Sequence, residues 1–357
     1  MLDLRYGKKL IGKEEYKKLM KAQGKLISKL VPKAEVVLAT SVTAGGYQVK
    51  ELEEIPVVIM DESTQSTEAC SLIPLSAYEA QKFVFVGDEK QLSSFSEIPY
   101  LEQSLFERIL KNGTYKNPHM LNVQYRMHPM ISQFPIKRFY KGLLTDGVTE
   151  EERTFENTKP LTFIDYGKVH QESKVMNSSK SDVNRGYTFQ NKGEAQMILR
   201  TLKDLVIMKD VSRRNIGIVT PYSAQRNLVA EMVQRDHLIN PKNERIQEEI
   251  DDDFSISSNK RPASIKTICG IMVSSIDAFQ GREKDFIIFS CVRSNPQNNI
   301  GFVKDARRLN VALTRAKYGL ILVGNKSCMQ NGDTLWKDLI HHFESKNCVA
   351  TPNSLGF

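Results

Sequence analysis

The sequence lacks the features that place a protein in a membrane or in an oxidising compartment. No run of about 18 apolar residues occurs, so we expect no transmembrane helix. The first twenty residues are basic and contain no apolar core, which argues against a secretory signal. The five cysteines are scattered without a Cys-x-x-Cys pair. This scatter disfavours a zinc site or a disulfide framework and suits a reducing compartment.

The chain has an excess of positive charge. Its 357 residues include 50 Lys and Arg against 42 Asp and Glu, a formal net charge of +8. Such an excess favours a polyanionic partner, although simple solubility explains it equally well. Hydrophobic residues make up 40% of the chain, which is enough to bury a core, and the length indicates about two domains.

Short apolar strands alternate with helical patterns along the first third of the chain. The first 35 positions are rich in lysine, and apolar residues recur there at helical spacing, which predicts a basic amphipathic helix. Apolar runs predict strands at residues 35–40, 57–60 and 83–86. This alternation is typical of a parallel sheet that helices cover on both faces.

The same pattern starts again near residue 120, which predicts a second α/β domain. The expected strands lie at residues 215–220, 270–275, 286–290 and 319–324, and a helix is expected over 309–317. Residues 168–186 and 240–261 are rich in polar residues, and we interpret both segments as surface loops.

Polar side chains follow two of the predicted strands. Asp61 and Glu62 come directly after the strand at 57–60, which is the arrangement of a Walker B element. Hydrolysis of a nucleoside triphosphate needs one carboxylate to hold Mg²⁺ and another to activate water. Gln91 follows the next strand and could bridge the γ-phosphate and that water. A polar turn capped by Asp88 is the alternative interpretation.

Two arginines could supply the positive charge that such a reaction requires. Arg126 and Arg315 are candidates for stabilising the charge that develops on the γ-phosphate oxygens. An ordinary structural ion pair is the alternative for each of them.

Six segments occur in an order that matches a known family. They are Asp61-Glu-Ser-Thr-Gln65, Gly87-Asp-Glu-Lys-Gln-Leu92, Gln124-Tyr-Arg-Met-His-Pro129, Thr220-Pro-Tyr-Ser-Ala-Gln225, Ser275-Ile-Asp-Ala-Phe-Gln-Gly-Arg-Glu283 and Arg308-Leu-Asn-Val-Ala-Leu-Thr-Arg-Ala-Lys317. The set resembles motifs II to VI of superfamily 1 helicases. It is most similar to the up-frameshift, nonsense-mediated-decay type and, within it, to the fungal branch associated with translation termination. The resemblance runs from about residue 5 to 340.

This resemblance implies an α/β fold made of two RecA-like P-loop NTPase domains, the first one incomplete. Residues 1–120 would form a partial first domain with motifs Ic, II and III. Residues 121–345 would form the second domain with motifs IV, V and VI, and residues 346–357 would be a tail.

The family implies ATP and Mg²⁺ as cofactors and assigns a role to each matching position. Asp61 and Glu62 would serve the metal and the attacking water, Gln91 would sense the γ-phosphate, and Arg126 and Arg315 would contact that phosphate. Tyr125 would stack on the adenine, Glu283 would lie near the ribose or metal, and Gln280 and Gly281 would shape the turn that couples both ligands. The matching nucleic-acid contacts are Thr40, Ser41, Val42, Thr220, Pro221, Tyr222, Ser274 and Ser275, of which the serines are also explained by turn chemistry.

The sequence departs from the family at the phosphate-binding loop, G-x-x-x-x-G-K-[ST]. Residues 7–14 are similar in spelling, but Glu14 stands where a hydroxyl is needed and would repel phosphate. We therefore expect the chain to be the carboxyl-terminal part of a helicase core, without the first strand and this loop.

The resemblance implies an enzyme, an ATP-dependent helicase that translocates 5′ to 3′ on single-stranded RNA or DNA in mRNA decay or translation termination. Translation-termination or mRNA-decay proteins would be its partners. A cytoplasmic monomer without a membrane partner is expected, and the basic stretches leave a nuclear visit open. The alternatives are a truncated module that binds nucleic acid or protein without hydrolysis, and a truncated product without a stable role.

Overall fold

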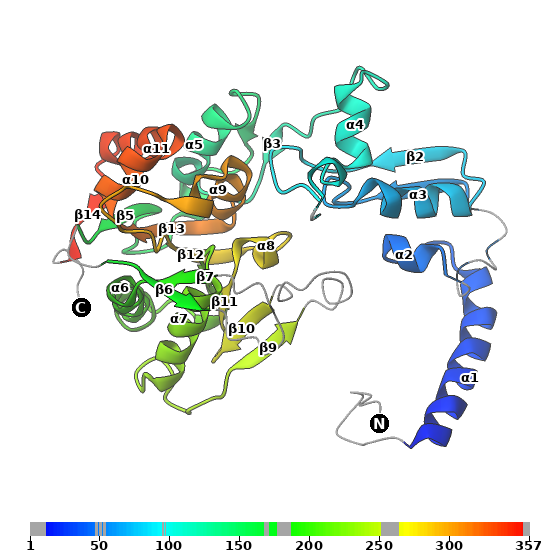
Figure 1. Cartoon of the computed structure of the whole chain (residues 1–357), viewed down its shortest axis with the longest axis horizontal. Helices are drawn as coiled ribbons and strands as arrows, with labels where there is room; N and C mark the ends of the chain where they lie inside the picture. Colours follow the sequence, from blue (N-terminus) through cyan, green and yellow to red (C-terminus); the bar gives the residue numbers. More distant parts are fainter. Residues whose placement is uncertain are drawn as a thin grey trace. The chain divides into compact units, whose positions relative to one another are not determined.

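The computed structural model describes residues 12–46, 49, 52, 55–94, 96, 98–167, 171–176, 187–250 and 264–352. The chain divides into two compact units, unit 1 (Met1–Pro118) and unit 2 (His119–Phe357) (Figure 1). Part of the phosphate-loop-like segment at 7–14 and part of both expected loops lie outside the described residues.

The described part of unit 1 contains a small parallel sheet, four α-helices and two 3-10 helices. Its elements are α1 (Lys13–Leu30), η1 (Val31–Lys33), α2 (Ser41–Ala44), β1 (Val57–Met60), α3 (Glu68–Ala77), β2 (Lys82–Phe85), η2 (Pro99–Leu101) and α4 (Leu105–Lys111). The helix expected from the lysine-rich segment and the strands at 57–60 and 83–86 are confirmed, the last shifted by one residue. β1 and β2 pair in parallel, with Val57 opposite Lys82.

Two expectations for unit 1 are wrong. Residues 35–40 form no strand, and Val36 and Leu38 are exposed. A strand is stable only when it pairs with another strand, and none of the described residues pairs with this segment. The two strands that do form are not covered on both faces, because Ile59, Phe83 and Val84 are exposed. Within the described residues, unit 1 therefore holds two strands of a sheet with uncovered apolar side chains.

Unit 2 is built on an eight-stranded sheet in the order β14-β5-β13-β12-β8-β11-β10-β9. The strands are β5 (Leu161–Asp165), β8 (Ile216–Val219), β9 (Gln247–Ile250), β10 (Ser264–Ile268), β11 (Ile271–Ser274), β12 (Lys284–Ser290), β13 (Ala316–Gly324) and β14 (Val349–Ala350). Neighbouring strands are parallel except at β10, which is antiparallel to both of its neighbours. Two small pairs accompany the sheet, β3 (Val123–Gln124) with β4 (Thr145–Asp146) and β6 (Ser173–Met176) with β7 (Tyr187–Gln190).

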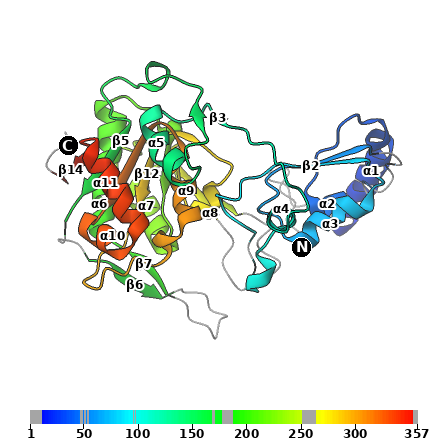
Figure 2. The same ribbon diagram turned by 90° about the horizontal axis from the view of Figure 1, so that it is seen from above.

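Helices cover both faces of this sheet (Figures 1 and 2). They are α5 (Pro129–Arg138), η3 (Glu151–Arg153), α6 (Lys192–Lys203), η4 (Asp204–Met208), η5 (Arg213–Asn215), α7 (Ser223–Arg235), α8 (Ile276–Phe279), η7 (Gly301–Lys304), α9 (Ala306–Leu313), α10 (Lys326–Gly332) and α11 (Thr334–Ser345). On one face, α6 packs against β12 and β13, and α7 packs against β10 and β11; α5 and α11 also contact the sheet, at β13 and β5.

The central position of β12 in the sheet explains why its sequence is a continuous apolar run. Phe286 and Ile288 point into the core formed with α6 and α7. Phe289 points to the opposite face, where its ring lies 6.5 Å from Trp336 of α11. Both sets of side chains are buried because successive residues of a strand face opposite sides. Trp336 is the only tryptophan of the chain, so its fluorescence reports on unit 2.

The four strands expected in the second half are confirmed, with β13 starting three residues earlier than predicted. The helix expected over 309–317 is partly wrong, because α9 ends at Leu313 and Ala316 already belongs to β13. The loop interpretation is also partly wrong, since residues 173–176 and 247–250 form strands. In the described part of the chain, no helix is long and apolar enough to cross a membrane.

Candidate nucleotide and nucleic-acid site

The first group of candidate residues lies at the carboxyl ends of β1 and β2. The Ser63 hydroxyl and main-chain N–H both donate to the Val86 carbonyl at 2.8 Å, which ties the two strand ends together. Asp61 and Glu62 follow β1 and are exposed. Gln91 follows β2, and its amide donates to Asp88 at 2.8 Å. The parallel pairing thus brings both acids and Gln91 to the same edge of the small sheet, as expected for parallel strands.

The Glu62 carboxylate is held in a defined direction. Its backbone lies in the left-handed region, with φ of 48°, a conformation that is uncommon for a residue with a side chain. The Asp61 carboxylate accepts the Glu62 main-chain N–H at 2.9 Å. The Gln65 amide donates to Glu62 Oε2 at 2.7 Å. The motifs assigned no role to Gln65. Its position three residues after Glu62, in a turn, is the sequence feature that could have predicted this contact.

These carboxylates suit Mg²⁺ as donors. Magnesium prefers oxygen ligands and is often bound by one or two carboxylates together with substrate phosphates. No group of three or more His, Cys, Asp or Glu that could hold a metal occurs among the residues that the structure describes. A site that borrows ligands from the nucleotide and water is therefore the arrangement that Asp61 and Glu62 fit.

A second group lies at the amino ends of β12 and β13 in unit 2. The Arg126 Nε donates to Glu283 Oε2 at 2.6 Å, and its Nη1 donates to the Thr314 carbonyl at 3.1 Å. Lys317 reaches the other oxygen of Glu283, also at 2.6 Å. The hydrogen bond from Lys317, together with Arg126, keeps the pKa of Glu283 below its usual range. The Arg126 guanidinium is thus fixed by two bonds that use different nitrogens.

The turn that carries Tyr125 and Arg126 is built by its neighbours. The Gln124 side-chain oxygen accepts the main-chain N–H groups of Arg126 and Met127 at 3.0 and 2.8 Å. Arg153 donates to the main-chain carbonyls of Tyr125 and Arg126 at 2.7 and 2.9 Å. The Tyr125 ring itself is 65% exposed, so its face is available for a planar ligand. Sequence reasoning missed Arg153, for which an isolated arginine gives no signal.

The Arg315 side chain, in contrast to that of Arg126, is buried. It is only 2% exposed, and its guanidinium donates to the Val311 carbonyl at 3.0 Å and to the Thr314 hydroxyl at 2.9 Å. The structure therefore places this side chain against the carboxyl end of α9, whereas Arg126 lies at the surface beside Glu283.

The nucleic-acid positions expected in unit 2 gather at the opposite, carboxyl edge of the large sheet. Thr220 and Ser274 follow or end neighbouring strands, and the Thr220 N–H donates to the Ser274 carbonyl at 3.1 Å. Both are buried, as is Tyr222, whereas Pro221 and Ser275 are partly exposed. Pro221 and Ser275 are therefore the expected positions at this edge that reach the surface.

Two further groups complete the set of expected positions. In unit 1, the Thr40 hydroxyl accepts the Thr43 N–H and caps α2, while Ser41 is half-buried and Val42 is exposed. In unit 2, residues 275–283 run from the carboxyl edge back to the amino edge, where Glu283 lies. Gly281 has φ of 73°, and both polar atoms of the Gln280 amide are buried without a hydrogen-bond partner within the described residues. The segment joins the two candidate regions of unit 2 covalently.

The carboxyl edge also contains a buried acid that the motifs do not include. Glu194 of α6 accepts hydrogen bonds from the Tyr166 and Ser290 hydroxyls and from the Val292 N–H. Val292 needs this support because its φ is 67°, which is strained for a β-branched residue. Burial raises the pKa of Glu194 to about 7, although these hydrogen bonds act in the opposite direction. Glu194 therefore holds the turn that follows β12.

We expect Glu194 to make the stability of unit 2 depend on pH. A glutamate in an unfolded chain titrates near pH 4.3, so between that pH and about 7 the folded state binds more protons than the unfolded state. The free energy of unfolding is therefore higher below this pH range and falls as the pH rises from about 4.3 to about 7. Relative to Glu194→Gln, the wild-type unfolding free energy should fall by about 3 kcal/mol. Urea titrations followed by Trp336 fluorescence measure it, and a pH-independent difference would contradict it.

Known proteins resemble this chain over most of its length. Two family models, each described as an AAA domain, match residues 7–96 and 101–327. The Saccharomyces cerevisiae protein named "Putative ATP-dependent RNA helicase ECM32" is 47% identical over 350 residues, covering 96% of this chain and 31% of that protein. The "ATP-dependent helicase NAM7" of the same yeast is 36% identical, covering 94% of this chain and 32% of NAM7. "Regulator of nonsense transcripts 1" of Caenorhabditis elegans is 36% identical, covering 90% of this chain and 27% of that protein.

The chain spans about a third of the length of these relatives. The second AAA model alone covers more than half of the chain, and the matched region includes the motifs that line both edges of the large sheet. The chain therefore belongs to the AAA-domain superfamily 1 helicases of the up-frameshift type.

Proposed function

We propose that this chain carries the nucleic-acid-binding and γ-phosphate-contacting parts of an ATP-dependent helicase. The observation that supports the proposal best is the Arg126–Glu283–Lys317 cluster at the amino edge of the large sheet. Glu283 ends the segment 275–283, which starts among the candidate nucleic-acid positions at the carboxyl edge. A change at one edge therefore has a short covalent route to the other, which is what coupling of two ligands requires.

The proposed roles follow the geometry of each residue. Glu62, with its direction fixed by Gln65, would activate the attacking water, and Gln91 would sense the γ-phosphate. Asp61 and Glu62 would hold Mg²⁺, which supplies positive charge to the phosphates when it is bound. Arg126 would stabilise the transferring phosphoryl group together with Arg315, at the carboxyl end of α9, and exposed Tyr125 would stack on the adenine. Glu283 would keep Arg126 oriented and lie near the ribose or metal.

The finer assignments are also proposals. They comprise the domain limits 1–120, 121–345 and 346–357, and 5′ to 3′ movement on single-stranded RNA or DNA by a monomer. A role in mRNA decay is supported by relatives named "Regulator of nonsense transcripts 1". Translation termination, the corresponding protein partners and a cytoplasmic or partly nuclear location rest on the motif resemblance.

Binding of single-stranded RNA by the purified 357-residue chain tests the proposal. The logarithm of the affinity for a fluorescein-labelled oligouridylate should fall linearly with the logarithm of salt concentration. The slope is expected to be about −4, because about six phosphate contacts contribute roughly −0.7 each. Binding that is absent, or that is insensitive to salt, would contradict the proposal and favour a protein partner.

A module that binds nucleic acid without hydrolysing ATP is the second candidate. The observation that favours it is the absence of a phosphate-binding loop from the 357 residues. That loop supplies the main-chain N–H groups and the lysine that hold the β- and γ-phosphates. We expect the 357-residue chain to bind RNA without measurable ATP turnover, and turnover stimulated by RNA would exclude this second candidate.

A further inference from the structure

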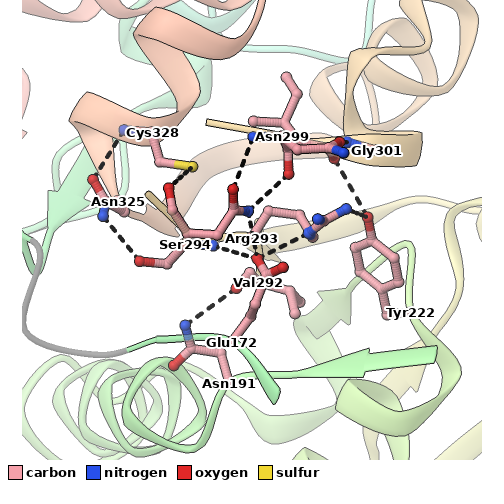
Figure 3. A network of polar contacts seen from close by, with 12 residues as sticks. Glu172, Asn191, Tyr222, Val292, Arg293, Ser294, Asn299, Gly301, Asn325 and Cys328 are labelled. Carbon is pink, nitrogen blue, oxygen red and sulfur yellow. Dashed lines mark hydrogen bonds and ion pairs between the residues drawn. The ribbon is translucent and has the colours of Figure 1, made fainter. Parts of the chain in front are cut away.

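The β6–β7 hairpin of unit 2 is firmly attached at the carboxyl edge of the large sheet. Figure 3 shows the Glu172 carboxylate, just before β6, directed at Arg293 and the main chain of Ser294. Its Oε2 accepts the Arg293 Nε at 2.9 Å, the Ser294 N–H at 2.7 Å and the Asn295 amide at 3.0 Å. On the other strand, the Thr188 hydroxyl accepts the Ala224 N–H at 3.3 Å. The hairpin is thus fixed beside the segment 220–222, where nucleic acid is proposed to bind.

Aromatic rings and cations alternate across this region. The Phe189 ring of β7 lies 5.5 Å from the Tyr222 ring, and the Arg293 guanidinium lies 4.1 Å from the centre of Phe189. The Tyr222 ring is in turn 6.3 Å from Phe302, and the Arg308 guanidinium lies 5.9 Å from Phe302. Of the inner rings, Tyr222 is buried and Phe189 is partly buried.

The two ends of the row are open to solvent. Tyr187 is 61% exposed and Phe302 is 63% exposed. Tyr187 and Phe189 lie two residues apart on β7 and therefore share one face of the hairpin. Lys174 is opposite Phe189 in the register, so it lies on that face too, with its ammonium group 5.7 Å from the Tyr187 ring. No ion pair of Lys174 with a carboxylate occurs among the described residues.

We propose that the hairpin face of Tyr187 and Lys174 is an additional contact site for single-stranded nucleic acid. Tyr187 would stack on a base, and Lys174 would bind the adjacent phosphate. An aromatic ring beside an ammonium group on the same face of a hairpin supplies both interactions that sequence-independent strand binding uses. The inference rests on the proposed function, since it extends the same carboxyl-edge site.

The charge of this face favours a polyanion over an apolar protein partner. Lys174, Arg293 and Arg308 all lie along the row, and among the described residues the carboxylates paired with them are Glu172, on Arg293, and Asp277 and Asp305, on Arg308. Lys174 has no ion pair with a carboxylate in the described part of the chain, and it lies next to the exposed ring of Tyr187. A site for an apolar helix would instead need a groove of buried apolar side chains.

Variants at the exposed end test the proposal with the 357-residue chain and fluorescein-labelled oligouridylate. Tyr187→Ala is expected to lower the affinity about 5- to 100-fold without changing the salt slope, because it removes stacking. Tyr187→Phe keeps the ring and should bind like the wild type. Lys174→Ala should make the salt slope shallower by about 0.7, because it removes one phosphate contact.

Two matched controls separate the possible outcomes. Tyr115→Ala removes an exposed tyrosine of unit 1, and Lys242→Ala removes an exposed lysine of unit 2 away from the hairpin; both should leave affinity and slope unchanged. Unaltered Trp336 fluorescence shows that each variant of unit 2 is folded. Wild-type affinity in Tyr187→Ala and Lys174→Ala would overturn this inference alone. A wild-type chain that binds no oligonucleotide would overturn the proposed function as well.

Discussion

Replacing Glu172 by glutamine is expected to lower the free energy of unfolding of unit 2 by about 3–5 kcal/mol. The reason is that the Arg293 guanidinium is only 6% exposed, and Glu172 supplies its countercharge. A buried charge whose partner is removed keeps its desolvation cost without the compensating attraction. The amide of glutamine would also face the Ser294 N–H and the Asn295 amide with less acceptor capacity than the carboxylate.

Urea unfolding followed by Trp336 fluorescence measures this effect in unit 2 alone. Glu231→Gln is the matched control, because Glu231 is exposed and lies 4.0 Å from Arg235 on the same helix. That surface pair should contribute less than about 0.5 kcal/mol. Replacing both Glu172 and Arg293 by methionine should recover part of the loss, since no charge then remains buried. A decrease in the unfolding free energy of less than about 1 kcal/mol in Glu172→Gln would show that Glu172 does not stabilise the buried Arg293 charge as expected.

The second large effect concerns catalysis. Glu62→Gln is expected to lower the ATP turnover number by about 10²- to 10⁴-fold, because the amide cannot accept a proton from the attacking water. Nucleotide affinity should stay within about threefold, since the amide keeps the size of the carboxylate. The measurement uses a chimera in which this chain replaces the matching segment of the protein named "Putative ATP-dependent RNA helicase ECM32".

Glu79→Gln provides the control for that experiment. Glu79 is also an exposed carboxylate of unit 1, but it lies between α3 and β2 in the sequence. It is therefore not at the carboxyl ends of β1 and β2, where Glu62 and Gln91 lie. The chimera with this change should hydrolyse ATP at the unmodified rate. Turnover that persists in the Glu62→Gln chimera would show that Glu62 is not the residue that activates water.

Local sequence patterns predicted the strands that tertiary packing later buried. The strands at 216–219 and 286–290 are covered by helices on both faces of the sheet. Their sequences are therefore continuous apolar runs, which composition alone can identify. The run at 35–40 has a similar composition, yet it forms no strand, because pairing depends on a partner that the sequence of this segment does not reveal. The hairpin strand at 173–176 was missed for the opposite reason, since its polar sequence is stabilised by β7 and by Glu172.

The candidate site was predictable as a set of residue types and not as a set of contacts. The motif order singled out Arg126 and Glu283, which are 157 positions apart in sequence and form an ion pair. The motif order did not predict that Lys317 also forms an ion pair with Glu283. It did not predict that Arg153 donates hydrogen bonds to the main-chain carbonyls of the turn at Tyr125 and Arg126. Burial of Arg315, Thr220 and Tyr222 follows from long-range packing, which motif spacing does not encode.

The central claim is that this chain couples ATP chemistry to a nucleic-acid strand. The most direct test is the rate of ATP hydrolysis by the ECM32 chimera with and without single-stranded RNA. We expect hydrolysis that increases when RNA is added and that falls about 10²- to 10⁴-fold in the Glu62→Gln chimera. Hydrolysis at the same rate with and without RNA, in a chimera that binds the RNA, would contradict it.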